Sequence, residues 1–179
     1  PPLGWKLVWN DEFDADGPPN PAIWGYEEGF VRNDELQWYQ RENAACKGGI
    51  LTIEARREKK PNPRYRPGGR GFSGRPSIEV TSACLITRGK HELTYGRIEM
   101  RARIDVRLGS WPAFWTLGTG RARWPECGEI DIMEYYTGTV LANVCHALAG
   151  KQKWLTTKKP LPELGGEAWA KEFHVWTME

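Results

Sequence analysis

The sequence has little net charge and no long apolar run. Its 179 residues include 25 Lys and Arg against 23 Asp and Glu, which leaves a formal charge of +2. Because the basic residues are scattered rather than clustered, electrostatics gives no support for nucleic-acid binding. No apolar stretch approaches the roughly 18 residues that a membrane-spanning helix needs. The N-terminal residues also lack a charged segment followed by an apolar one, so we expect that any signal peptide has been removed or never existed, and localisation must be inferred otherwise.

Cysteine is scarce and widely spaced. The four cysteines, Cys46, Cys84, Cys127 and Cys145, form no CxxC pair, which argues against a zinc or redox motif. Each falls in or beside an apolar segment with strand-like composition. We expect buried free thiols, since unpaired cysteine is among the most buried residue types. A single disulfide stays open at this point.

Helical periodicity is almost absent, and short alternating segments take its place. Residues 97–105, RIEMRARID, place Ile98, Met100 and Ile104 on one side and charged residues on the other. Residues 59–76, rich in Pro, Gly and Arg, are expected to form a surface loop. Many short strands separated by turn residues predict an all-β sandwich or jelly roll within one domain, residues 1–179. The expected strands lie in WKLVW, GILTIEARRE, SIEVTSACLITRG, YGRIEMRARIDV, WPAFWTLG, GEIDIMEYY and LANVCHALAG.

Tryptophan is abundant, and three of the ten tryptophans crowd one region. Trp111, Trp115 and Trp124 precede the segment GEIDIMEYY, residues 128–136. Most tryptophans are structural, but sugar rings have apolar C–H faces that stack on an indole. The position of these three next to an acidic segment favours a carbohydrate site.

The segment GEIDIMEYY contains three carboxylates within an otherwise strand-forming run. On a regular strand Glu129 and Asp131 share a face, whereas Glu134 points to the other. A β-bulge near Ile132 and Met133 would return Glu134 to the face of the other two acids. The alternative is that the acids simply form a solvent-exposed face of the strand. The apolar residues that stand between the acids argue against this alternative.

Carboxylates on one face repel each other, so their grouping requires a functional reason. Retaining glycoside hydrolysis uses two carboxyl groups about 5 to 5.5 Å apart, one as nucleophile and one as proton donor. A third acid can hydrogen-bond the nucleophile and separate the two pKa values. The three acids therefore predict a glycoside hydrolase.

The motif resembles the E-x-D-x-x-E signature of glycoside hydrolase family 16, the laminarinase and agarase group, in its bulged form. Further segments resemble landmarks of that family in family order, so the resemblance covers essentially the whole chain. These segments are LVWNDEFD, NDELQWYQ, GGILTIEARRE, TSACLITRGKHELTYGRIEMRARI, GSWPAFWTLG and EFHVWTME.

The resemblance implies a concanavalin A-like jelly roll of two curved antiparallel sheets, with the glycan across the concave face. It implies that Glu129 is the nucleophile, that Glu134 is the general acid and then base, and that Asp131 orients Glu129. The positions implied to contact substrate are Asn33, Trp111, Trp115, Trp124 and His146.

The sequence departs from the family pattern in two places. Many laminarinases have a glucan-holding Arg where this chain has Cys84, and Arg88 is the candidate substitute. The family pattern also continues beyond EFHVWTME with further strands, so we expect strands or a second polypeptide segment to complete the sandwich. The resemblance also implies a structural calcium, which many family members hold through backbone carbonyls at positions matching Glu12 and Gly49 and through an Asp of the last strand, and oxygen ligation suits that ion. No cofactor is expected for the chemistry itself.

The leading hypothesis is therefore a secreted, endo-acting, retaining hydrolase of a β-linked polysaccharide, with a β-1,3-glucan as the expected substrate. A galactan hydrolase acting on agar-like chains is the alternative within the family. A second alternative is a module of the same fold that binds glycan without cleaving it. Such relatives typically lose one or more of the acids, and all three are present here. A purely structural β protein is the weakest of these readings.

Overall fold

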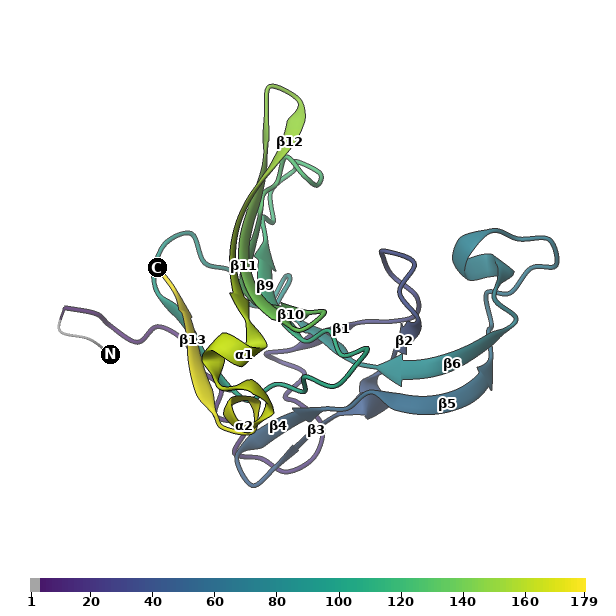
Figure 1. Cartoon of the computed structure of the whole chain (residues 1–179), viewed down its shortest axis with the longest axis horizontal. Helices are drawn as coiled ribbons and strands as arrows, with labels where there is room; N and C mark the ends of the chain where they lie inside the picture. Colours follow the sequence, from purple (N-terminus) through teal and green to yellow (C-terminus); the bar gives the residue numbers. More distant parts are fainter. Residues whose placement is uncertain (1–3) are drawn as a thin grey trace. The chain divides into compact units, whose positions relative to one another are not determined.

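The structure is a computed structural model that describes residues 4–179. The chain divides into two compact units after Glu92, and each is described here by itself. Strands β1 to β13 dominate both, and the helices are confined to short turns, so the all-β prediction is confirmed (Figure 1). The prediction of a single domain stays a prediction.

The first unit contains three small sheets. Strand β1 (Gly25–Glu27) pairs antiparallel with β7 (Cys84–Ile86), and β3 (Ala44–Lys47) forms a hairpin with β4 (Ile50–Ile53). A third sheet has the order β2-β6-β5, in which β2 runs parallel to β6. Its strands are β2 (Gln37–Tyr39), β6 (Ser77–Ser82) and β5 (Arg56–Pro61), and two 3-10 turns, η1 (Arg41–Asn43) and η2 (Gly71–Gly74), complete the unit.

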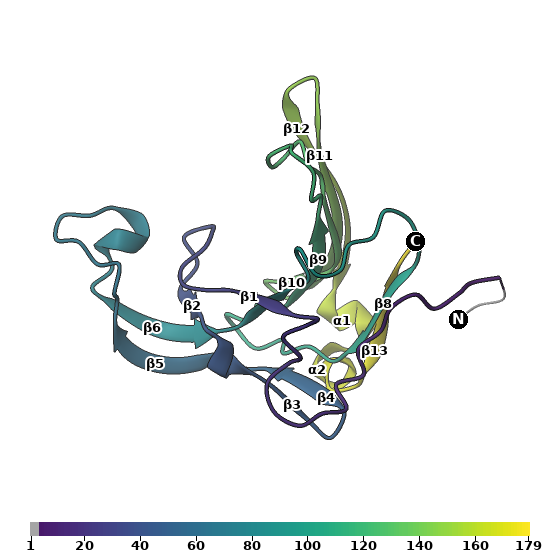
Figure 2. The same cartoon turned by 180° about the vertical axis from the view of Figure 1, so that it is seen from behind.

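The second unit is built on a four-stranded antiparallel sheet of order β12-β11-β10-β9, whose strands lie side by side in both views (Figures 1 and 2). Strand β8 (Ile98–Ala102) pairs with β13 (His174–Met178) in a separate ladder. The helices α1 (Leu161–Leu164) and α2 (Gly166–Ala170) connect β12 to β13. The four sheet strands are β9 (Ala113–Leu117), β10 (Glu129–Tyr136), β11 (Thr139–Leu148) and β12 (Lys151–Pro160).

Two tight turns fix the register of this sheet. Thr137 and Gly138 connect β10 to β11, and Ala149 and Gly150 connect β11 to β12. All four residues have positive φ, between 49° and 79°, as a two-residue type I′ hairpin turn requires. The pairing of β11 with β12 then runs without a break from Thr139 opposite Pro160 to Leu148 opposite Lys151.

One face of this sheet packs on the core of the unit. Met133 is 2% exposed and clusters with Tyr135, Ile104, Leu161 and Ala170. Phe114, Val140 and Trp176 are among the side chains that pack around this cluster. The buried face therefore contains Met133 and Tyr135 of β10, which fixes the direction of their neighbours along the strand.

Several expected elements differ from the observed ones. WKLVW, residues 5–9, forms no strand, and the strand expected over residues 77–89 is divided into β6 and β7. The expected loop over residues 59–76 begins inside β5. Strand β12 was not expected, because its sequence KQKWLTTKKP has no apolar alternation, and every residue in it is exposed. The alternation predicted around Ile98 is confirmed, with Ile104 buried and Ile98 and Met100 partly buried.

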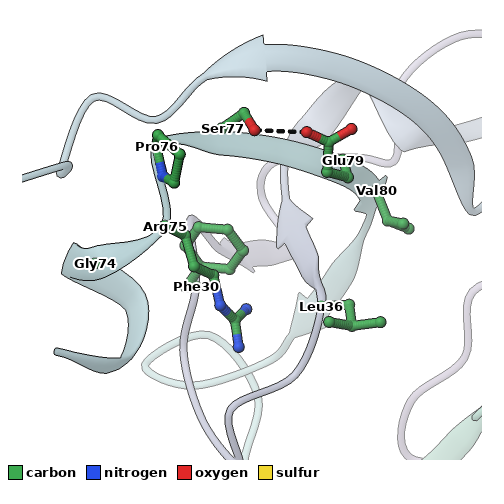
Figure 3. A pocket seen from close by; sticks show the side chains of 8 residues that line it. All are labelled: Phe30, Leu36, Gly74, Arg75, Pro76, Ser77, Glu79 and Val80. Carbon is green, nitrogen blue, oxygen red and sulfur yellow. Dashed lines mark hydrogen bonds between the residues drawn. The ribbon is translucent and has the colours of Figure 1, made fainter.

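A pocket of about 370 Å³ opens in the first unit (Figure 3). Arg75 is one of its lining residues, and the guanidinium carbon of Arg75 lies 5.0 Å from the ring centroids of both Phe30 and Phe72. Glu79 is the single acid in its lining and is hydrogen-bonded to Ser77. One carboxyl group cannot supply both an acid and a nucleophile, so we do not place glycoside chemistry here. The lining is formed by Phe30, Leu36, Gly74, Arg75, Pro76, Ser77, Glu79 and Val80.

In the part of the chain that the structure describes, no helix has the length and apolar character needed to cross a membrane.

Candidate active site

Strand β10 contains the bulge that the spacing of the acids predicts. Its pairing with β11 shifts register between Asp131 and Glu134, and its pairing with β9 shifts between Asp131 and Met133. On the β11 side the shift falls on Ile132 and Met133, whereas on the β9 side it falls on Ile132, because Met133 is paired there with Phe114. The prediction of a bulge at this point is confirmed.

The bulge separates the acids from the core residues. Met133 and Tyr135 point into the core, so Glu134 between them points to the other face. Asp131, before the bulge, pairs with Asn143 of β11, and directly opposite side chains share a face. A contact to a common partner can therefore show whether Glu134 and Asp131 lie on one side.

Asn143 makes that contact. Its Nδ2 donates to Oδ2 of Asp131 at 2.9 Å and to Oε2 of Glu134 at 2.8 Å. Asn143 is only 6% exposed, so its amide is held in place beneath the two carboxyls. Glu129 lies two residues before Asp131 on the regular part of the strand, so all three acids share one face.

The sequence analysis did not single out Asn143. The only signal that pointed to it was its place opposite Asp131, which follows from the two-residue turn between β10 and β11. It is a positioning residue, because its amide orients two carboxyls.

Two tryptophans donate hydrogen bonds to the outer acids. Trp124 Nε1 lies 2.6 Å from Oε2 of Glu129, and Trp111 Nε1 lies 2.6 Å from Oε1 of Glu134. Both indoles are nearly half exposed, at 48% and 44%. Each ring therefore fixes a carboxyl through its N–H while leaving much of its apolar surface open to a ligand.

The loop between β9 and β10 brings Trp124 to Glu129. The amide of Gly128 donates to the carbonyl of Pro125, and the amide of Gly118 donates to the carbonyl of Gly128, which closes the loop. A Cβ at Gly118 would lie 2.1 Å from the carbonyl oxygen of Cys127, so only glycine permits this approach. The sequence GEID thus begins at a closed turn.

Two further aromatic residues border the acids. Trp115 of β9 lies directly opposite Asp131, and its side chain is partly buried. Tyr136 shares the face of Glu134, and its ring centroid lies 4.8 Å from that of Trp111. The structure therefore brings Trp111, Trp115 and Trp124 to the acid-bearing face, as the sequence indicated.

Burial perturbs two of the acids. Burial raises the pKa of Glu129, the neighbouring Asp131 and Glu134 charges raise it further, and the Trp124 hydrogen bond acts in the opposite direction. Burial also raises the pKa of Asp131, against the lowering effect of its hydrogen bonds with Asn143 and Glu129. Perturbed carboxyls in contact with each other are typical of sites built for acid-base work.

His146 lies on the other face of the sheet. Strand β11 is paired with β12 without a register shift, so its side chains alternate regularly. Asn143 points to the acids, and His146, three residues later, therefore points away from them. The structure does not bring His146 to the acids, and its expected role toward the substrate stays a prediction.

Asn33 and Arg88 belong to the first unit and are exposed there. Asn33 has a positive φ of 54°, and its Nδ2 donates to Oε1 of Glu35 at 3.3 Å. Arg88 lies in the turn after β7 that the hydrogen bond from the amide of Lys90 to the carbonyl of Thr87 closes. Their expected roles toward the substrate stay predictions.

Cys84, which stands where many laminarinases have an arginine, faces a charged pair. It is the cross-strand partner of Glu27, and Glu27 forms an ion pair with Arg32. Burial raises the pKa of the Cys84 thiol to about 12, and the Glu27 charge adds to the effect. All four cysteines are free, as expected, with Cys46 and Cys145 buried and the other two partly buried.

The backbone positions expected to hold calcium lie close together. The carbonyl oxygen of Glu12 is 3.8 Å from where a Cβ would stand at Gly49. Calcium takes six to eight oxygen ligands, of which these carbonyls are at most two. Within residues 4–179 no group of three or more His, Cys, Asp or Glu side chains is arranged to hold a metal. Calcium binding stays a prediction.

Three carboxyls on one face of an antiparallel sheet, bordered by half-exposed indoles, form the kind of site that glycoside hydrolases use. Residues 36–160 match the XgeA-like catalytic domain of glycoside hydrolase family 16. The chain belongs to glycoside hydrolase family 16.

Individual relatives support this assignment. A β-glucanase of Rhodothermus marinus is 41% identical over 191 residues, which cover 98% of this chain and 59% of that protein. The solved structure of LamAcat from Zobellia galactanivorans is 31% identical with a TM-score of 0.76 and covers 97% of this chain and 72% of the other.

A second solved structure extends the comparison. It comes from work on endo-acting O-glycanases with which human gut bacteria initiate mucin breakdown, and it superposes with a TM-score of 0.87 at 27% identity. The match covers 99% of this chain and 66% of that structure. The jelly-roll prediction is thereby confirmed. The chain spans 59% of the length of the Rhodothermus protein and a smaller share of several other curated relatives.

Proposed function

We propose that the protein is an endo-acting, retaining glycoside hydrolase that cleaves a β-linked polysaccharide, with β-1,3-glucan as the preferred substrate. The observation that carries the proposal is the bulge at Ile132 and Met133, which places Glu134 on the face of Glu129 and Asp131. A strand has no structural need for three carboxyls on one face, whereas a double displacement uses two of them as nucleophile and proton donor, and the third can orient the nucleophile.

In the first step Glu129 attacks the anomeric carbon while Glu134 gives its proton to the leaving glycosidic oxygen. The bond from the anomeric carbon to that oxygen breaks, and a bond from the anomeric carbon to Glu129 forms. In the second step Glu134 removes a proton from water, whose oxygen attacks the anomeric carbon and releases Glu129. The first step leaves Glu134 deprotonated, as its role of base in the second step requires, and the second step returns a proton to Glu134 for the next cycle.

The neighbouring side chains support these roles. The N–H of Trp124 can only donate, so its hydrogen bond favours the ionised form of Glu129 that the attack requires. Asn143 holds Asp131 and Glu134 in fixed orientation, and Asp131 lies within hydrogen-bonding reach of Glu129. Carboxyls fixed before substrate arrives need little reorganisation during the reaction.

The relatives favour glucan as substrate, and one observation favours a second candidate. The Rhodothermus relative is named a β-glucanase, and a relative in Niallia circulans is a glucan endo-1,3-β-glucosidase with 28% identity. A keratan-sulfate endo-1,4-β-galactosidase of Sphingobacterium multivorum is 30% identical over 135 residues. Hydrolysis of a galactose-containing glycan is therefore the second candidate. Secretion fits a polymeric substrate, and we propose it as the localisation.

The test is product analysis with laminarin, mixed-linkage glucan, agarose and keratan sulfate, using the protein and its Glu129→Gln variant. Release of a series of oligosaccharides from laminarin by the parent, and none by the variant, is expected. Preferential cleavage of agarose or keratan sulfate would select the second candidate. Equal turnover by folded Glu129→Gln would remove Glu129 from the role of nucleophile.

A further inference from the structure

Strand β12 is the outermost strand of the acid-bearing sheet within the described residues (Figure 2). All ten of its residues are exposed. Its composition is polar except for Trp154 and Leu155, which are 45% and 67% exposed. A large indole on an exposed strand is unusual, because edge strands are commonly protected by charged side chains such as lysine. Its position therefore requires an explanation.

The pairing places Trp154 on the face of the acids. Glu129 lies opposite Cys145 of β11, and Cys145 lies opposite Trp154 of β12. Directly opposite side chains of an antiparallel pair share a face, so Glu129, Cys145 and Trp154 form one row across three strands. The hydrogen bond from Asn143 to Asp131 confirms which face this is, since Asn143 and Cys145 alternate together.

The middle of that row is recessed relative to its two ends. Cys145 has a small side chain, is 1% exposed, and lies 3.7 Å from the amide nitrogen of Gln152. Gln152 and Thr156, two residues before and after Trp154, share its face and are exposed. The row thus has a carboxyl at one end, a small buried thiol in the centre, and an indole with polar neighbours at the other end.

The Trp154 ring is available for a ligand. Its side chain makes no ring contact and no hydrogen bond within residues 4–179, whereas Trp169 and Trp176 pair with each other at 5.8 Å. Strands lie about 4.8 Å apart, so Trp154 is displaced by roughly 10 Å from Glu129. A sugar unit that stacks on the Trp154 ring is therefore a different unit of the polysaccharide from the one bound at the acids.

We propose that Trp154 is a stacking platform for a sugar unit remote from the bond that is cleaved. The inference rests on the proposed function and adds a specificity determinant to it: β12 makes long chains better substrates than short ones. Binding energy gained on a remote sugar is available to orient the reacting one. The flanking Gln152 and Thr156 are placed to hydrogen-bond the hydroxyl groups of the same sugar.

The experiment uses laminari-oligosaccharides of increasing length and compares Trp154→Ala with Leu155→Ala. Leu155 is the matched control, because it is the next residue, is more exposed and points to the opposite face. We expect Trp154→Ala to lose about 3- to 10-fold in kcat/KM on long oligosaccharides and nothing on the shortest one that is cleaved. Leu155→Ala should match the parent at every length, and Trp154→Phe should recover part of the loss.

A binding measurement separates stacking from any effect on the chemistry. In the Glu129→Gln background, calorimetric titration should show tighter binding with each added sugar up to the one that reaches Trp154. Trp154→Ala should remove that last increment and leave the earlier ones. A loss that is equal at all lengths, or no loss, would overturn the inference while leaving the proposed function intact. A parent protein that neither cleaves nor binds any glycan of the test panel would overturn both.

Discussion

The indole N–H of Trp124 donates a 2.6 Å hydrogen bond to Oε2 of Glu129, five residues further along the chain. The closed turn at Gly118 and Gly128 makes this contact possible, since it brings the loop back onto the start of β10. Trp124 therefore has two separable functions in the proposed reaction. Its N–H favours the carboxylate of Glu129, and its ring offers a surface to a sugar.

Trp124→Phe should separate these two functions. Phenylalanine keeps an aromatic surface but has no donor, and the Trp124 hydrogen bond lowers the pKa of Glu129. Its loss should therefore raise that pKa and move the acidic limb of the kcat/KM profile to higher pH. Trp124→Ala should show the same shift with an additional fall in affinity of about 3- to 10-fold. An unchanged acidic limb in Trp124→Phe would contradict the assignment of Glu129 as the group that must be ionised.

Glu129→Gln should stabilise the fold at neutral pH. Burial raises the folded-state pKa of Glu129 above its unfolded value, so the contribution of this group to stability is fully present below the unfolded pKa. That contribution is lost as pH rises through the folded pKa, because ionising a half-buried carboxyl beside Asp131 is unfavourable. Glutamine does not ionise, so the variant avoids this cost at neutral pH.

Thermal unfolding of the parent and Glu129→Gln across pH 3 to 8 measures this effect. The two melting temperatures should converge at the acid end and separate toward neutral pH, with the variant higher. Glu126→Gln is the control, since Glu126 lies in the same loop region and is exposed. A variant that is less stable than the parent at neutral pH would show that the Glu129 charge is stabilised rather than strained.

Asn143→Ala should lower kcat by about 10- to 100-fold, because it releases two carboxyls whose orientation the reaction needs. Asn143 also lowers the pKa of Asp131, so its removal should raise that pKa. A purely structural role would change stability but leave the pH profile in place. Val144→Ala is the control, since Val144 is the next residue and points to the other face. An unshifted pH profile in Asn143→Ala would argue for the structural role.

The spacing of the acids was sufficient to predict the bulge. Three carboxyls at positions 129, 131 and 134 can share a face only if one extra residue is inserted between the second and the third. The apolar residues at 132 and 133 left one place for it, and the structure has it there. The prediction succeeded because side chains on a strand alternate strictly between two faces. Once the three acids are assumed to share one face, the alternation requires an extra residue between Asp131 and Glu134.

Strand β12 and the role of Asn143 could not be predicted in the same way. The sequence of β12 has no alternation, because both of its faces are exposed, and it is extended through backbone pairing with β11. Asn143 acquires its role from the register that the Thr137-Gly138 turn imposes. The same register places His146 on the opposite face, which a resemblance in sequence could not reveal. Pairing register, rather than composition, determines these features.

Met133→Ala should destabilise the second unit by about 2–5 kcal/mol, since it removes a side chain that is 2% exposed at the centre of its core. The bulge itself is a backbone feature, so kcat should stay within about threefold of the parent at temperatures where the variant is folded. Leu148→Ala, at a position that is 54% exposed, should change stability by less than about 0.5 kcal/mol. Urea unfolding measures both. A Met133→Ala variant of parental stability would contradict the assigned core.

The stereochemistry of the first product tests the bulge at the level of chemistry. If the bulge brings Glu134 and Glu129 to opposite sides of one glycosidic bond, their carboxyls should lie about 5 to 5.5 Å apart, which leaves no room for a water between them. Glu129 must then attack directly from the side opposite the leaving oxygen, and in the second step water attacks from the side that the leaving group has left, opposite Glu129. Two inversions at the anomeric carbon give net retention, so a β-linked chain should first release the β anomer. Proton NMR of the anomeric signal in the first minutes, before mutarotation, measures this, and initial release of the α anomer would mean that Glu129 activates a water instead.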